Sequence, residues 1–177
     1  ADAIAVLMRH NIGVLDELTP WLSDQNNATP HPDSLCFERV STQIVAAPSQ
    51  SLKAAQEFLE SQGVECWVLG DSIEGDSETV ARVMAETALW QRRNRTLAKP
   101  LCLLSGGETT VKVTGSGVGG PNAHFALALL DALDGARGIS AIACDTDGVD
   151  GAAEIAGAVI DDQTLARMRD ANLDLRD

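Results

Sequence analysis

The stretch that decides the fold is LSGGETTVKVTGSGVGGPNAHFAL, residues 104–127. Within it Gly115, Gly117 and Gly120 have the G-x-G-x-x-G spacing of loops that hold a dinucleotide pyrophosphate. That fingerprint requires a buried parallel strand directly before the loop. The preceding segment, ETTVKVT at 108–114, alternates apolar and polar residues, which predicts a strand with one solvated face. We therefore expect a glycine-rich loop that is not a dinucleotide site.

Outside this stretch, short apolar segments alternate with amphipathic helical segments. We expect strands at residues 42–47, 64–70, 101–107, 108–114, 138–145 and 156–161, with the third and fourth forming a hairpin-like excursion. We expect helices at residues 49–63, 75–95, 122–133 and 162–172. This alternation predicts an α/β fold, a layered α/β/α domain with a mostly parallel (mixed) sheet, Rossmann-like but not a dinucleotide-binding Rossmann domain.

The first part of the chain differs in composition from the rest. Residues 1–12 predict a helix, and residues 19–35 contain three prolines and several turn formers, as linkers do. We assign residues 1–35 to the tail of a preceding domain with its linker, and residues 36–177 to the α/β domain. Neither end of the chain carries a closing element, so we expect a fragment whose α/β domain is truncated at its C-terminal end.

Charge and composition exclude several classes of partner. The net charge of −13 would repel a phosphate backbone, so we expect no nucleic acid partner. No apolar run approaches the roughly 20 residues that cross a bilayer, and no secretory leader is present. We therefore expect a cytoplasmic protein without a membrane partner. The four cysteines and three histidines are scattered, which indicates reduced thiols and gives no support for a zinc site.

A second glycine-rich stretch, CDTDGVDGAAEIAG at residues 144–157, follows an apolar strand. Asp145, Asp147 and Asp150 crowd this loop at the carboxyl end of the strand, where open α/β sheets bind their ligands. Carboxylates suit Mg²⁺, which also binds substrate phosphates. The alternative is a set of Asx turns and a helix cap. Glu108 follows the carboxyl end of another buried strand, which favours a site at this edge.

The glycine run at residues 115–120 also has two interpretations. Its backbone amides, together with the start of the helix after Pro121, can form an anion site, and Asn122 can cap that helix. The alternative is a glycine-rich turn that binds nothing.

Together these segments resemble the C-terminal, MOFRL region of the glycerate 2-kinases, a family also known as TtuD-like hydroxypyruvate reductases. The resemblance rests on SGGETTV, GGPN, TDGVDG and AGA between about residues 101 and 160, and on VLGDSIEGDSETVARV upstream. It implies transfer of the γ-phosphoryl group of ATP to the 2-hydroxyl of D-glycerate, with ATP and Mg²⁺ as cofactors. It also implies a cleft shared with an N-terminal domain that is missing here, so the fragment alone is expected to be inactive.

Carried onto this chain, the resemblance implies a set of site residues. The catalytic acids are Asp147, Asp150 and Glu108, and the first two are also the metal ligands. The substrate- or phosphate-binding residues are Ser105, Gly106, Gly107, Thr109, Gly119, Gly120 and Asn122. Two positions depart from the family pattern. Pro121 stands where some members have arginine, and His124 stands where glutamate is usual.

Two other functions remain open from the sequence. One is an NAD(P)H-dependent hydroxypyruvate reductase, and the other is a non-catalytic module that binds small anions. The oligomeric state is also open, with a homodimer as one alternative.

Overall fold

The computed structural model describes residues 2–13, 15–96 and 98–175. The chain divides into two compact units, Ala1–Val45 and Ala46–Asp177. The sequence placed this boundary at residue 35. The first unit contains the helices α1 (Asp2–Arg9) and α2 (Leu15–Ser23) and the short 3₁₀ turns Gln25–Asn27 and Leu35–Phe37. Its second helix includes Thr19–Ser23, which we had expected to begin a linker.

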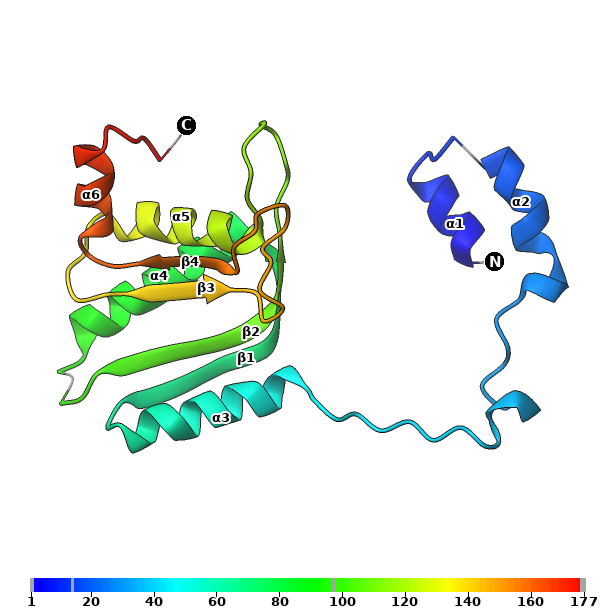
Figure 1. Ribbon diagram of the computed structural model, residues 1–177, viewed down its shortest axis with the longest axis horizontal. Coiled ribbons are helices and arrows are strands. Elements are labelled where there is room, and N and C mark those ends of the chain that lie inside the picture. Colours follow the sequence, from blue (N-terminus) through cyan, green and yellow to red (C-terminus); the bar gives the residue numbers. More distant parts are fainter. Residues whose placement is uncertain (1, 14, 97, 176–177) are drawn as a thin grey trace. The chain divides into compact units, whose positions relative to one another are not determined.

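The second unit has the alternating order that the sequence predicts. Its elements are α3 (Pro48–Ser61), β1 (Glu65–Asp76), α4 (Ser77–Asn94), β2 (Leu101–Thr110), α5 (Pro121–Leu133), β3 (Ala141–Cys144), β4 (Gly157–Ile160) and α6 (Thr164–Asp170). β1 pairs with β2 in parallel, and β3 pairs with β4 antiparallel (Figure 1). The predicted layered α/β class is confirmed, with β1–β2 as a parallel pair and β3–β4 as a separate antiparallel pair. No helix in the described part of the chain has the length and apolar character needed to cross a membrane.

The core lies where α4 and α5 pack together. Ala81 and Ala85, one helical turn apart on α4, are fully buried. They share one cluster with Leu129 and Leu130 of α5 and Ile160 of β4. Because alanine has a short side chain, the two helices can approach closely and bury the leucines of α5 between them.

The helices cover both faces of the β1–β2 pair. The Ser105 hydroxyl lies 3.9 Å from the sulfur of Met84 on α4. The next residue, Gly106, faces Leu52 of α3, since a Cβ added to the glycine would lie 3.4 Å from the leucine side chain. Successive residues of a strand point to opposite faces. Therefore α3 packs on one face of this pair and α4 packs on the other.

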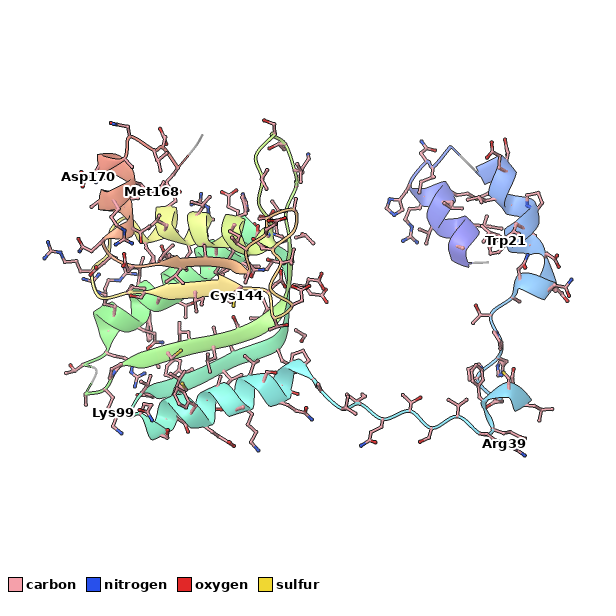
Figure 2. The ribbon with its side chains drawn as sticks, viewed as in Figure 1. Trp21, Arg39, Lys99, Cys144, Met168 and Asp170 are labelled. Carbon is pink, nitrogen blue, oxygen red and sulfur yellow. The ribbon has the colours of Figure 1, made fainter. Side chains whose placement is uncertain are left out.

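Two strand predictions are wrong in the structure. Residues 101–107 and 108–114 are not separate strands, because β2 is continuous to Thr110 and residues 111–114 belong to no strand. The reason is that β1 extends to Asp76 and supplies partners for the last residues of β2. Residues 42–47 are also outside any strand. Cys144 is exposed at the end of β3 (Figure 2), although it lies in an apolar run of the sequence.

The corner between β4 and α6 is held by a charged hydrogen-bond cluster. The guanidinium of Arg167 donates to Asp161 at 2.9 Å, and the hydroxyl of Thr164 donates to the same carboxylate at 2.8 Å. These bonds, that from Arg167 foremost, lower the pKa of Asp161 from 3.8 to about 2. A depressed pKa in the folded state stabilises the fold above the unfolded pKa, and that stabilisation is lost as the pH falls through the folded value.

We expect Asp161→Asn to remove one component of acid sensitivity. Wild type should lose stability relative to this variant as the pH falls from about 4 to about 2, because only wild type must protonate this carboxylate. Urea unfolding at a series of pH values measures the difference. Arg167→Gln should shift the profile in the same direction, and parallel pH profiles for wild type and both variants would contradict the assignment.

Candidate functional site

Asp150 lies at the centre of the candidate site and is fully buried. One carboxylate oxygen accepts hydrogen bonds from the backbone N–H of Asn122 at 2.9 Å and from its side-chain amide at 3.2 Å. The other oxygen accepts from the backbone N–H of Ala123 at 2.7 Å. The N-cap residue of α5, Gly120, makes no side-chain cap. Asp150 therefore caps α5 from a distant loop and places its charge at the positive end of the helix.

The same asparagine positions a second acid. The side-chain amide of Asn122 donates to a carboxylate oxygen of Asp145 at 2.9 Å. Asp145 follows β3 directly and is exposed, and its backbone N–H donates to the carbonyl of Ala156. Asn122 thus joins one buried and one exposed carboxylate. The sequence placed Asp145 in the acidic loop but did not select it as a site residue, although its position at a strand end was the available signal.

The two glycine-rich stretches are in direct contact. The N–H of Ala152 donates to the carbonyl of Gly119 at 3.2 Å. A Cβ added at Gly120 would overlap the backbone and side chain of Asp150. In contrast, Gly115 and Gly117 have no atom within 4 Å of an added Cβ. The three glycines of the fingerprint therefore do different things, and the last one makes room for Asp150.

The motif residues Ser105, Gly106 and Gly107 lie within β2 and not in a loop. Gly107 has a φ of 143°, and an added Cβ there would overlap the backbone of Ile73 on β1. A residue with a side chain is strongly disfavoured at this position, because its Cβ would overlap that backbone and its φ lies in the region that favours glycine. Strand packing thus explains Gly107, whereas a Cβ added at Gly106 would make only ordinary contacts. The predicted role of the two glycines in binding substrate or phosphate stays a prediction.

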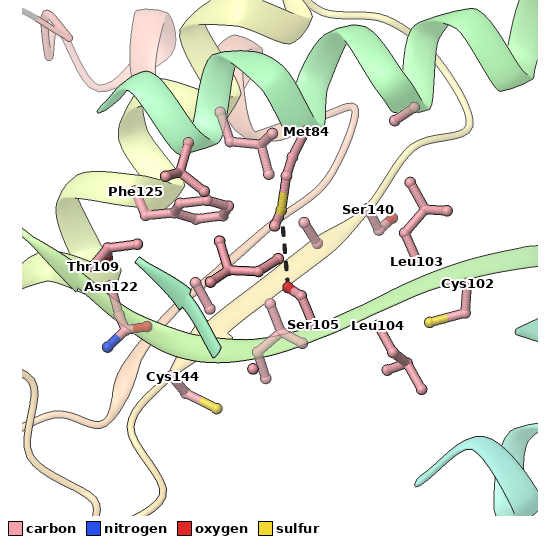
Figure 3. Close-up of a pocket in the computed structure, with 18 of the residues that line it drawn as sticks. Met84, Cys102, Leu103, Leu104, Ser105, Thr109, Asn122, Phe125, Ser140 and Cys144 are labelled. Carbon is pink, nitrogen blue, oxygen red and sulfur yellow. Dashed lines mark hydrogen bonds between the residues drawn. The ribbon is translucent and has the colours of Figure 1, made fainter. Parts of the chain in front are cut away.

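Glu108 and Thr109 lie near the carboxyl end of β2 and line a cavity that Asn122 and Asp145 also line. Phe125 of α5 and Met84 of α4 line the same cavity, and Figure 3 labels them together with Thr109 and Asn122. Six of the site residues selected from the sequence therefore line one cavity: Ser105, Gly106, Gly107, Glu108, Thr109 and Asn122.

Asp147 lies on the exposed side of the acidic loop. One of its carboxylate oxygens accepts the N–H of Val149, two residues on, at 2.9 Å, which is an Asx turn. The alternative interpretation of this loop was a set of Asx turns and a helix cap. Asp147 forms such a turn, and Asp150 caps α5.

The metal-ligand role expected for Asp150 does not fit its surroundings. Its side chain is inaccessible, and both oxygens already accept N–H donors. Within residues 2–13, 15–96 and 98–175, no three acidic, histidine or cysteine side chains are arranged to hold a metal ion. Mg²⁺ that arrives with a nucleotide usually needs only one or two carboxylates. The exposed carboxylates of Asp145 and Asp147 meet that lesser requirement.

His124, the second departure from the family pattern, joins two helices. Its Nδ1 lies 2.6 Å from the hydroxyl of Ser77, which is fully buried at the start of α4. The histidine in the first turn of α5 is therefore partly buried and fixed against α4. This contact holds the starts of the two helices together beside the site.

The rejection of a dinucleotide site needs a different reason from the one the sequence suggested. No separate one-faced strand precedes the glycine run, because β2 ends at Thr110 and residues 111–120 form a loop before α5. A dinucleotide loop instead turns directly from strand to helix and presents the helix N-terminus to the pyrophosphate. Here that N-terminus already holds the carboxylate of Asp150.

We expect Asp150→Asn to lower the free energy of unfolding by about 1.5–3 kcal/mol, because it replaces a buried charged acceptor with an amide that faces N–H donors. Asp147→Asn is the matched control and should change stability by less than about 0.5 kcal/mol, since its side chain is exposed. Urea unfolding of both variants measures this. Equal losses would show that Asp150 does not hold the loop to α5.

Gly120→Ala should destabilise the fold by about 1–3 kcal/mol, because the added methyl group overlaps Asp150. Gly117→Ala makes the same chemical change in the same loop but meets no neighbour, so we expect less than about 0.5 kcal/mol. Thermal unfolding of the pair is the measurement, and a harmless Gly120→Ala would contradict the close packing of the two loops.

Comparisons with known proteins agree with this architecture. A protein of Agrobacterium vitis, named provisionally as a hydroxypyruvate reductase, is 42% identical over 99% of this chain and 40% of its own length. The D-glycerate 2-kinase of Thermotoga maritima is 31% identical over 95% of this chain and 39% of its own length. The crystal structure of glycerate kinase from Thermotoga maritima superimposes with a TM-score of 0.72 and 25% identity, covering 99% of this chain and 41% of that one.

The chain thus spans about 40% of the length of these relatives. The pattern of the MOFRL family matches residues 101–177, which contain β2, the glycine-rich loop, α5 and the acidic loop. Residues 101–177 of this chain therefore match the MOFRL family, and the relatives of the chain are named glycerate kinases and hydroxypyruvate reductases.

Proposed function

We propose that this chain is the C-terminal part of a glycerate 2-kinase, which transfers the γ-phosphoryl group of ATP to the 2-hydroxyl of D-glycerate. The observation that carries the proposal is the exposed carboxylate of Asp145, held by Asn122 at 2.9 Å beside a cavity. The names of the kinase relatives support the choice of reaction.

Phosphoryl transfer to an alcohol needs a group that positions the hydroxyl and accepts its proton. In the proposed reaction the 2-hydroxyl oxygen of glycerate bonds to the γ-phosphorus, the bond from that phosphorus to ADP breaks, and a carboxylate takes the proton. Asp145 suits this task, because Asn122 fixes one of its oxygens and the group remains accessible. Asp150 acts indirectly by holding Asn122 in place.

Mg²⁺ bound with ATP would neutralise charge on the phosphates. In this chain Asp147 is the proposed carboxylate ligand, because it is exposed and only one of its oxygens is engaged, by Val149. Glu108 lines the cavity with Asp145, and we propose that its carboxylate accepts a hydrogen bond from a hydroxyl group of the bound glycerate.

Hydroxypyruvate reduction is the second candidate, favoured by the name of the Agrobacterium vitis relative. Such a reaction needs a nicotinamide dinucleotide, whose pyrophosphate carries negative charge. The α5 N-terminus, which would receive that group in a Rossmann domain, is filled by Asp150. For this reason we rank the reductase second.

The test uses the full-length polypeptide that contains this chain. D-glycerate with MgATP is expected to give phosphoglycerate and ADP, followed by ³¹P NMR, whereas hydroxypyruvate with NADH should give no oxidation of NADH. NADH oxidation without phosphoryl transfer would replace the kinase with the reductase.

In the same protein, Asp145→Asn should lower kcat by about tenfold or more with little change in the unfolding curve, because it removes the proton acceptor but keeps a side chain of the same shape. Asp170→Asn, at the exposed end of α6, is the control and should keep full activity. Steady-state kinetics measures both, and unchanged turnover in Asp145→Asn would remove this residue from the mechanism.

A further inference from the structure

Two cysteines lie side by side near the start of the β1–β2 pair. Cys66 of β1 and Cys102 of β2 are direct partners in the parallel register. This register is regular up to Val68 and shifts only after that residue. In-register residues of neighbouring parallel strands point to the same face of a sheet. The two thiols therefore meet on one face, and their side chains share a hydrogen bond.

The pair lies on the face of β1 and β2 that α3 covers. Gly106 faces Leu52 of α3, and alternation along β2 places Cys102 on the same side as Gly106. Cys66 is buried, with 7% of its surface exposed. Cys102 is half-buried and lines the cavity of the candidate site, whose volume is about 870 Å³ (Figure 3). One member of the pair is thus accessible to a small solute, whereas the other is shielded.

The spacing of neighbouring strands permits a bond between these two sulfurs. Parallel strands lie about 4.8 Å apart, which falls within the roughly 4.4–6.8 Å that separates the Cα atoms of disulfide-linked residues. The Cβ atoms of a disulfide are usually about 3.8 Å apart, so the strands must approach by up to about 1 Å as the bond forms. A bond that forms against such a constraint is readily reduced again, as regulatory disulfides are.

The reduced form is the resting state of the pair. All four cysteines of the chain lie within the described residues and are free thiols. Burial, together with the charge and the hydrogen bond of Cys66, raises the pKa of the Cys102 thiol. The thiolate is the reactive form of a cysteine, and a raised pKa keeps it scarce. The pair therefore stays reduced until a strong oxidant reaches it.

We infer that Cys66 and Cys102 form a site that hydrogen peroxide oxidises, in which Cys102 reacts first and Cys66 then closes a reversible disulfide across β1 and β2. The Cys102 thiol loses its proton, its sulfur attacks one peroxide oxygen, and the O–O bond breaks. The hydroxide that leaves takes up the proton as water, and Cys102 is left as a sulfenic acid. The sulfur of Cys66 then attacks the sulfur of Cys102, and the S–O bond breaks. The leaving hydroxide and the Cys66 proton form a second water.

The order of the two steps follows from exposure. Hydrogen peroxide reaches Cys102 from the cavity, whereas the shielded Cys66 meets only its oxidised neighbour. Cys144 is more exposed than either, but it lies opposite Gly157 in the β3–β4 pair and so has no thiol across from it. This inference goes beyond the proposed function and holds whichever reaction the protein catalyses.

The test is peptide mapping of the 177-residue chain after treatment with hydrogen peroxide. The four cysteines fall on four different tryptic peptides, residues 10–39, 54–82, 96–112 and 138–167, so every pairing has its own mass. Without reductant, peptides 54–82 and 96–112 of the monomeric protein should be recovered as one species that has lost two hydrogen atoms. A dithiol reductant should separate them again.

Three variants test the roles of the individual thiols. Cys66→Ser leaves Cys102 without a second thiol, so Cys102 should stop at the sulfenic acid and react with dimedone. Cys102→Ser should leave Cys66 unmodified, because its thiol is shielded. Cys144→Ser is the matched control and should not change the yield of the linked peptides. Urea unfolding of each variant reports whether the fold is intact.

Three results would overturn the inference. The first is a wild-type chain that gives no link between peptides 54–82 and 96–112 after Cys144 has been fully oxidised. The second is a link from Cys102 to Cys144 across the cavity. The third is a link between Cys66 and Cys102 that occurs only in covalent dimers. Dimedone labelling of Cys66 in Cys102→Ser would overturn the order of the two steps.

Discussion

The buried carboxylate of Asp150 is the interaction on which the loops of the second unit depend. A charge removed from water costs several kcal/mol unless donors replace its hydration. Here the backbone of Asn122 and Ala123, the amide of Asn122 and the helix dipole supply that replacement. Because these donors belong to α5, they tie the acidic loop to the start of that helix, where Asp145 accepts a hydrogen bond from Asn122.

The same constraint explains which glycines are required. Gly120 and Gly151 lie in contact where the two loops cross, and an added Cβ on either would meet the backbone of the other loop. Gly115 and Gly117 have no such neighbour. The three glycines that have the spacing of a phosphate-binding motif therefore have two different roles. Gly120 is required for close packing, whereas Gly115 and Gly117 lie in an open part of the loop. The chemistry of the stretch lies in Asn122, which follows the run.

The sequence predicted the order of helices and strands well, because amphipathic periodicity is a local property that α3, α4 and α5 keep in the fold. It was wrong about the end of β2, since the length of that strand depends on β1, far away in the chain. The role of Asp150 was likewise unreadable locally, because its partner Asn122 lies 28 residues earlier. The cluster of acidic residues at a strand end indicated the right loop. It could not show which of these residues is buried against α5 and which is exposed at the cavity.

The charges at the site indicate which groups of the two substrates this region could bind in a kinase of this kind. The groups that this chain brings to the cavity are the carboxylates of Glu108 and Asp145 and the amide of Asn122, on a chain of net charge −13. Asp147 is exposed in the same acidic loop as Asp145. The helix N-terminus that would attract a phosphate is satisfied internally by Asp150. Carboxylates repel a triphosphate but suit a hydroxyl group and a cation. Under the proposed function, this region therefore handles the alcohol and the metal, and positive charge for the phosphates comes from the part of the protein that the relatives carry outside it.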